Sequence, residues 1–183
     1  DVIASRILMG RLEKKKIEIE TIEDISDEIF WPGRFKRRYV SKKRGDPFLT
    51  ASEVFMFVPK ARKFVVNYPD NLSVKEKWLL ITRSGSIGRC LITTYLLRKL
   101  VLSDDLIRIV AKDESSLGYL YAYLNTWVGQ AFLPKDQYGA TVKHIEPHHV
   151  SKIPIPHIPE LRREISPSCS KHTCYLKRGK SIF

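Results

Sequence analysis

The order of hydrophobic and polar positions divides the chain into helical ends and a middle of short strands. Near the N-terminus, apolar side chains recur at helical spacing: Ile3, Ile7, Leu8 and Leu12. Residues 14–16 are three lysines, which suit a helix C-terminus. We therefore predict a helix over residues 1–16. Residues 166–183 lack any period, and we expect a loosely ordered basic tail there.

Short β-favouring runs dominate the chain from residue 64 onward. The predicted strands are FVV at 64–66, WLLIT at 78–82, IGRCLIT at 87–93, LVLS at 100–103 and LIRIV at 106–110. The turn at 84–88 joins two of them as a hairpin or corner. A further strand is expected near Tyr39 and Val40. Thr50 and Glu53 have capping-box spacing, which indicates one short helical turn.

One strong helix is predicted at residues 116–133, capped by Ser115 or Ser116. Its apolar face comprises Leu117, Leu120, Tyr121, Leu124, Val128 and Phe132, and we interpret this face as core. Pro154 and Pro156 alternate with isoleucines, which indicates an extended edge strand or a polyproline segment. Pro159 suits the first position of a closing helix.

These elements predict one α+β domain with a twisted, largely antiparallel sheet, one main helix and helical pieces at both ends. The length of 183 residues suits a single domain with its own core. The expected division is a helix at 1–16, a domain at 17–165 and the tail at 166–183.

Charge changes the picture from a folded domain to a binding domain. The chain carries 32 Lys and Arg against 20 Asp and Glu, a net charge of +12, which points to DNA, RNA or an acidic membrane surface. No stretch is long and apolar enough to span a membrane. The three cysteines form no even framework, which favours a reducing cytoplasm.

The densest cationic stretch lies between Arg34 and Arg44, with seven basic residues and no acidic one. A solvated loop is the plain alternative, but such crowding of like charge favours a polyanionic partner. The candidate DNA-binding residues here are Arg34, Lys36, Arg37, Arg38, Tyr39, Lys42 and Lys43.

Two further loops combine glycines with hydrogen-bond donors. The candidates they supply are Arg83, Ser84, Ser86, Thr141, Lys143 and His144. Glycine lets a DNA backbone approach closely, while arginine can read a guanine edge or clamp a phosphate. Arg83 could instead brace the fold by pairing with Asp104 or Asp105. We expect the two loops to approach DNA together.

We find no catalytic or metal-binding constellation in the sequence. The segment GSIG at 85–88 lacks the strand–loop–helix context of a dinucleotide site, and no P-loop lysine follows it. Asp70 lacks the spaced acidic and lysine partners of a nuclease. Cys169, His172 and Cys174 lack a fourth zinc ligand. The histidines at 144, 148 and 149 are more typical of surface groups.

Taken in order, six segments resemble one known family. They are PGRFKRRYV with GDPFL at 32–49, WLLITRSGSIGR at 78–89, LSDDLIRIV at 102–110, LGYLYAYLNTWVGQ at 117–130, YGATVKHIEPHHVSKIPIPHIP at 138–159 and a helix start at 160–165. The chain resembles a target recognition domain of a type I restriction–modification specificity subunit over residues 17–165. It shows one such domain, whereas full-length subunits usually carry two separated by long helices.

The resemblance implies sequence-specific binding of double-stranded DNA, with one half of a split target read by each domain. It also implies partners: a DNA methyltransferase subunit, a restriction motor subunit and a second recognition domain. S-adenosylmethionine, ATP and magnesium would then belong to the partner subunits, and this chain would bind no cofactor and catalyse no reaction. The alternatives left open are the recognition domain of a fused restriction–methyltransferase enzyme, an RNA-binding module and a nuclease.

Overall fold

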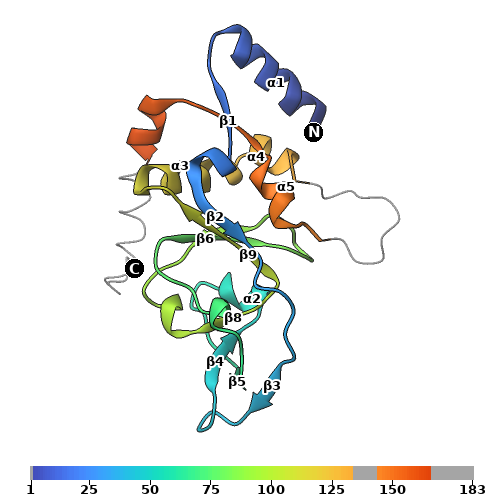
Figure 1. Cartoon of the computed structure of the whole chain (residues 1–183), viewed down its shortest axis with the longest axis vertical. Helices are drawn as coiled ribbons and strands as arrows, with labels where there is room; N and C mark the ends of the chain where they lie inside the picture. Colours follow the sequence, from blue (N-terminus) through green and yellow to red (C-terminus); the bar gives the residue numbers. More distant parts are fainter. Residues whose placement is uncertain (1, 134–143, 166–183) are drawn as a thin grey trace.

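The computed structural model describes residues 2–133 and 144–165, which form three sheets stacked along the long axis of the molecule (Figure 1). At one end, β1 (Ile19–Thr21) pairs with β10 (Pro154–Pro156). The central sheet has the order β2-β9-β6-β7, and the sheet at the far end has the order β3-β5-β4-β8.

The central sheet consists of β2 (Ser26–Phe30), β9 (Leu106–Ala111), β6 (Trp78–Thr82) and β7 (Cys90–Ile92), all paired antiparallel. Because side chains alternate across a strand, Leu79 and Ile81 join one core cluster while Leu80 joins another. Both faces of β6 and β9 are therefore buried, which explains why their sequences are almost continuously hydrophobic.

The far sheet consists of β3 (Arg38–Val40), β5 (Lys63–Val66), β4 (Asp46–Leu49) and β8 (Val101–Leu102). β4 pairs with β8 in parallel, whereas β5 pairs antiparallel with both β3 and β4. Three short helices flank these strands: α2 (Ala51–Val54), η2 (Asp70–Leu72) and η3 (Leu97–Lys99). The capping box expected at Thr50 and Glu53 is present at the start of α2.

The prediction of one long helix at 116–133 is wrong in its extent, because the structure has two shorter helices there. α3 (Glu114–Leu124) begins at Asp113, whose carboxylate accepts a hydrogen bond from the Ser116 amide, so Asp113 is the cap rather than either serine. The chain then turns, and the Thr126 hydroxyl caps α4 (Trp127–Ala131). A second local cap thus outweighs the continuous apolar period.

The face predicted for this region is nevertheless core. Leu117, Leu120, Leu124 and Val128 are buried, and Tyr121 and Phe132 pack against the same cluster. This cluster fills the space between α3 and the central sheet, and it also receives Met9 of α1 (Val2–Lys14) and Val150 of α5 (Pro147–Ser151). A helix is thus present in the region where one was expected, over Val2–Lys14 rather than up to residue 16, and it packs onto the core through one side.

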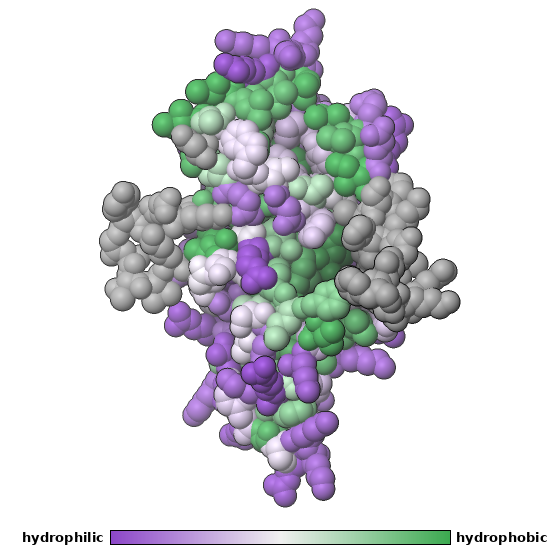
Figure 2. Space-filling model, turned by 180° about the vertical axis from the view of Figure 1, so that it is seen from behind, coloured by the Kyte–Doolittle hydropathy of each residue, from purple (hydrophilic) through white to green (hydrophobic). Residues whose placement is uncertain are grey.

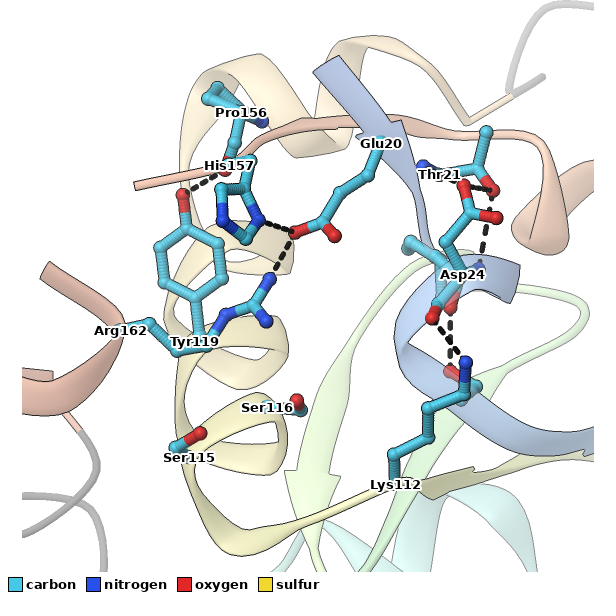
Figure 3. Close-up of polar contacts among 12 residues, drawn as sticks. Glu20, Thr21, Asp24, Lys112, Ser115, Ser116, Tyr119, Pro156, His157 and Arg162 are labelled. Carbon is cyan, nitrogen blue, oxygen red and sulfur yellow. Dashed lines mark hydrogen bonds and ion pairs between the residues drawn. The ribbon is translucent and has the colours of Figure 1, made fainter. Parts of the chain in front are cut away.

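The closing segment is fastened to the domain by a polar network (Figure 3). Residues 159–165 are helical and begin at Pro159, as predicted. Arg162 from this helix forms an ion pair with Glu20 of β1, and the His157 Nδ1 lies 3.2 Å from the same carboxylate. The Tyr119 hydroxyl donates to the Pro156 carbonyl at 2.6 Å. These contacts hold β1, α3 and the closing helix together.

The α+β class with largely antiparallel strands is confirmed, although the strands divide among three sheets rather than one. Pro154 and Pro156 lie in a true edge strand, β10, where the missing amide of proline costs no inner ladder bond. The 3₁₀ helix η1 (Glu23–Ile25) links β1 to β2. The fold thus consists of three small sheets that follow one another along the long axis of the molecule (Figure 1).

Candidate functional site

A cleft of about 460 Å³ lies where the central sheet meets the far sheet. Its cationic side chains come from the segments that connect strands of the two sheets, and the lining also includes hydroxyl and carboxylate groups. Its lining residues include Arg34, Arg37, Thr50, Ser52, Arg83, Ser84, Ser86, Arg89, Ser103, Asp104, Asp105 and His144. The cleft therefore combines donors for an anion with acceptors that hold those donors in place.

The β6–β7 hairpin forms one wall of the cleft, and Thr82 organises its turn. The Thr82 hydroxyl donates to the Ser86 carbonyl at 2.5 Å and accepts from the Arg89 amide at 3.0 Å. Gly88 has a φ of +88°, and a Cβ there would meet Leu133 at 2.5 Å. The turn is thus the tight hairpin corner that the pattern at 84–88 predicted, and the structure adds that Gly88 packs closely against Gln130 and Leu133.

Arg83 emerges from this corner almost completely buried. Its guanidinium forms an ion pair with Glu146 and lies 4.0 Å from the centre of the Trp31 ring. The side chain is only 7% exposed. Arg83 therefore joins three segments, and its bracing partner is Glu146 rather than Asp104 or Asp105.

The two loops expected to act together do lie together where the structure describes them. Ser84 and His144 form an isolated antiparallel bridge, and the Ile145 amide donates to the Arg83 carbonyl at 2.9 Å. The His144 Nε2 lies 3.2 Å from Glu146 Oε1, and the Ser84 hydroxyl donates to Asp105. Glu146 thus holds both Arg83 and His144 at the edge of the cleft.

Arg37 crosses the cleft from the other side. It forms an ion pair with Asp104, and its guanidinium carbon lies 5.7 Å from the centre of the Phe48 ring. The Trp31 indole donates to the Asp104 carbonyl at 2.5 Å. Asp104 therefore ties the segment before β3 to the turn between β8 and β9.

Arg108 lies beneath this turn, and sequence reasoning did not predict its role in holding the fold together. Arg108 has no exposed surface and donates to the carbonyls of Leu106, Leu102, Ser103 and Leu72. Burial lowers the pKa of Arg108 to about 10, against the opposing effect of Asp104, so the guanidinium stays charged at neutral pH. Arg108 thus holds four backbone carbonyls, including that of Ser103 in the cleft lining, around one buried cation.

The sequence profile of the type I restriction modification DNA specificity domain matches residues 11–165. The chain belongs to this family. The resemblance to a target recognition domain of a type I specificity subunit is thereby confirmed. A search of curated proteins found no significant relative of this specificity domain.

Solved structures agree on the fold. The chain is similar to a component of a type I restriction–modification system solved for complex assembly and conformational transition, with 16% identity, a TM-score of 0.61 and 96% of this chain covered. It is also similar to the HsdS subunit from Thermoanaerobacter tengcongensis, with 15% identity, a TM-score of 0.59 and 98% covered. The specificity domain spans 46% of each of these two chains.

A third similar structure is the type I restriction–modification S subunit from M. genitalium. Its identity is 13% and its TM-score 0.51, with 88% of this chain and 40% of that chain covered. All three likenesses are below 25% identity, so they concern the fold.

The structure sorts the candidate DNA-binding residues of the specificity domain into two groups. The cleft brings together Arg34, Arg37, Arg83, Ser84, Ser86 and His144. The exposed residues outside it, on or beside β3, are Lys36, Arg38, Tyr39, Lys42 and Lys43. Thr141 and Lys143 lie outside the described residues.

Sequence reasoning missed several residues that line the cleft or hold its side chains in place. Arg89 lines it, with its guanidinium carbon 4.5 Å from the centre of the Phe55 ring. Arg89 ends the quoted stretch 78–89, so its charge next to the glycine turn was a usable signal. Trp31 and Glu146 gave no such signal, because their roles depend on contacts between distant segments.

Within residues 2–133 and 144–165, no group of three His, Cys, Asp or Glu side chains could hold a metal ion. None of the helices in that part of the chain is long and apolar enough to cross a bilayer. The cleft carries arginines held by carboxylates and ring faces, and guanidinium groups of this kind have the chemistry of anion binding.

Proposed function

We propose that this specificity domain binds double-stranded DNA and reads one half of a split target. Family membership supports a role in DNA recognition. The observation that carries the proposal is the meeting of four arginines in one cleft beside an exposed basic surface. Phosphate contacts position a protein on DNA, and arginines reaching base edges supply the specificity.

The two groups of cations suggest a division of labour. Lys42 and Lys43 are exposed and have long flexible side chains, which suit phosphate neutralisation. Arg34 lines the cleft, is exposed and starts the basic stretch, which suits it to reach a base edge. Arg37 and Arg83 are held by carboxylates, so in the proposal they shape the surface as well as charge it.

The partners are proposed from the family alone. A DNA methyltransferase subunit would be brought by the domain to an adenine in the target, and a restriction motor subunit would cleave DNA elsewhere. A second recognition domain would read the other half of the target. We propose that this chain binds no cofactor of its own, catalyses no reaction and acts in the cytoplasm.

The test is selection from a randomised duplex pool at a stated salt concentration, with and without a type I methyltransferase subunit. We expect an enriched half-site, tighter binding in the presence of the subunit, and adenine methylation only when the subunit and S-adenosylmethionine are both added. Equal binding to single-stranded RNA of any sequence would contradict the proposal. Metal-dependent cleavage of plasmid DNA by the chain alone, lost on Asp70→Asn, would favour a nuclease.

A further inference from the structure

The segment after α2 exposes three consecutive apolar side chains. Met56 is 46% exposed, Phe57 90% and Val58 70%. Phe57 has the largest exposed fraction among the large hydrophobic side chains that the structure describes as exposed. A fully exposed phenylalanine contributes nothing to the core, so this position is not explained by folding.

The segment lies at the rim of the cleft. Ala51 and Ser52 of α2 line the cleft, and the ring of Phe55 lies under Arg89, which lines it as well. Phe57 follows Phe55 by two residues, just beyond the end of α2. The exposed ring is therefore a neighbour of the proposed DNA surface.

Cations follow the apolar tip along the chain. Lys60, Arg62 and Lys63 follow it, and all three are exposed. Lys63 lies 5.2 Å from the centre of the Tyr39 ring, which connects the segment to the basic residues of β3. Exposed cations beside an apolar side chain complement the phosphates of DNA.

We propose that Phe57 is a wedge that inserts between base pairs when the domain binds DNA, with Lys60 and Arg62 held against the flanking phosphates. Apolar side chains inserted in this way unstack a base step and bend the duplex. Flexible steps are easiest to unstack, so Phe57 contributes a preference for such a step without a hydrogen bond to any base. This inference rests on the proposed function and adds a specificity-determining residue to it.

The experiment uses the full chain and the duplex that it selects from the randomised pool, with 2-aminopurine replacing each adenine in turn. Wild type is expected to raise the fluorescence at one step. Phe57→Ala is expected to abolish that rise and to weaken binding by about 5- to 150-fold, the range for loss of a base–aromatic contact. Phe57→Leu is expected to retain most of both, because leucine also serves as a wedge.

The salt dependence separates the wedge from a charge effect. Phe57→Ala should leave the slope of log affinity against log salt unchanged, because no phosphate contact is lost. Ile3→Ala is the matched control, since Ile3 is 69% exposed but lies on α1 at the other end of the molecule (Figure 1). It should change neither affinity nor fluorescence.

Each other outcome overturns the wedge. If wild type and Phe57→Ala bind the selected duplex equally, the wedge is wrong while the proposed function stands. If wild type selects no duplex and binds none in a salt-dependent way, the proposed function fails and the wedge with it. If Phe57→Ala only converts an oligomer into a monomer in sedimentation, the ring is covered by a second copy of the chain.

Discussion

The central sheet and the far sheet use their residues differently. The core cluster on the α3 side of the central sheet contains nineteen buried residues among those that the structure describes, whereas the cluster within the far sheet contains four. On the face drawn in Figure 2, the far end of the molecule is covered largely by hydrophilic side chains, while hydrophobic ones reach the surface in the middle and toward the α1 end.

This difference teaches where stability and recognition reside. Burial of apolar surface is the main favourable term in folding, so the central sheet with α3 supplies most of the stability. The far sheet has less core and carries the exposed cations of β3, so it can vary its surface at small cost to the fold. The cleft lies between the two sheets, where the well-packed central sheet meets the far sheet with its exposed cations.

The largest expected effect is on the firm side of this comparison. Leu124→Ala should lower the free energy of unfolding by about 2–5 kcal/mol, because Leu124 is fully buried and the change leaves a cavity. Urea unfolding followed by circular dichroism measures the loss. Lys36→Ala is the control on the far side, and a comparable loss there would contradict the division.

Arg83→Ala tests the boundary between the sheets. We expect a loss of about 1–3 kcal/mol, because Glu146 would lose its cation and Trp31 its stacked guanidinium. Thermal melting gives the stability, and repeated pool selection gives the DNA preference. Lost stability with unchanged preference would make Arg83 a brace, while a relaxed preference at one base would assign it to base readout.

Lys42→Ala with Lys43→Ala probes the charged side. We expect binding to all duplexes to weaken about tenfold and the salt slope to fall by roughly 0.9 for each lost phosphate contact. Titration at several salt concentrations measures both quantities. An unchanged slope would remove these lysines from the DNA surface, and unchanged melting would separate their role from folding.

The smallest effect concerns pH. Burial lowers the pKa of His149, and its Nδ1 accepts a hydrogen bond from the Glu146 amide at 3.0 Å, which requires the neutral ring. A folded-state pKa below the unfolded value of 6.5 means that this stability is present above pH 6.5 and is lost as pH falls through the folded pKa. The melting temperature should therefore decrease slightly when the pH is lowered below 6.5. The decrease should be smaller in His149→Asn.

Much of the secondary structure followed from local pattern. The strands at 64–66, 78–82 and 106–110, the capping box at Thr50 and the start of the last helix at Pro159 all depend on neighbouring residues, so the sequence predicted them. The helix at 116–133 was predicted too long, because the period of its apolar face continues across a turn that Thr126 caps. A regular spacing of apolar residues indicates which side chains are buried. Those side chains can be buried by two consecutive helices as well as by one unbroken helix.

The candidate site was predictable in part, for the same reason. The basic stretch 34–44 and the glycine turn after Arg83 are visible as local sequence features. The partners that hold them are not, because Asp104 is 67 residues from Arg37 and Glu146 is 63 residues from Arg83 along the chain. Long-range pairing depends on how the sheets pack, and single residues carry no mark of it.

The sequence alone determined the class of the fold, the family and the charge that favours a polyanionic partner, because these follow from composition, local period and ordered motifs. Only the tertiary structure decided which cations point freely outward and which are held. It showed that Arg108 is a fully buried cation whose guanidinium donates hydrogen bonds to four backbone carbonyls. It also showed that Phe57, two residues after the C-cap of α2, is exposed although it is hydrophobic.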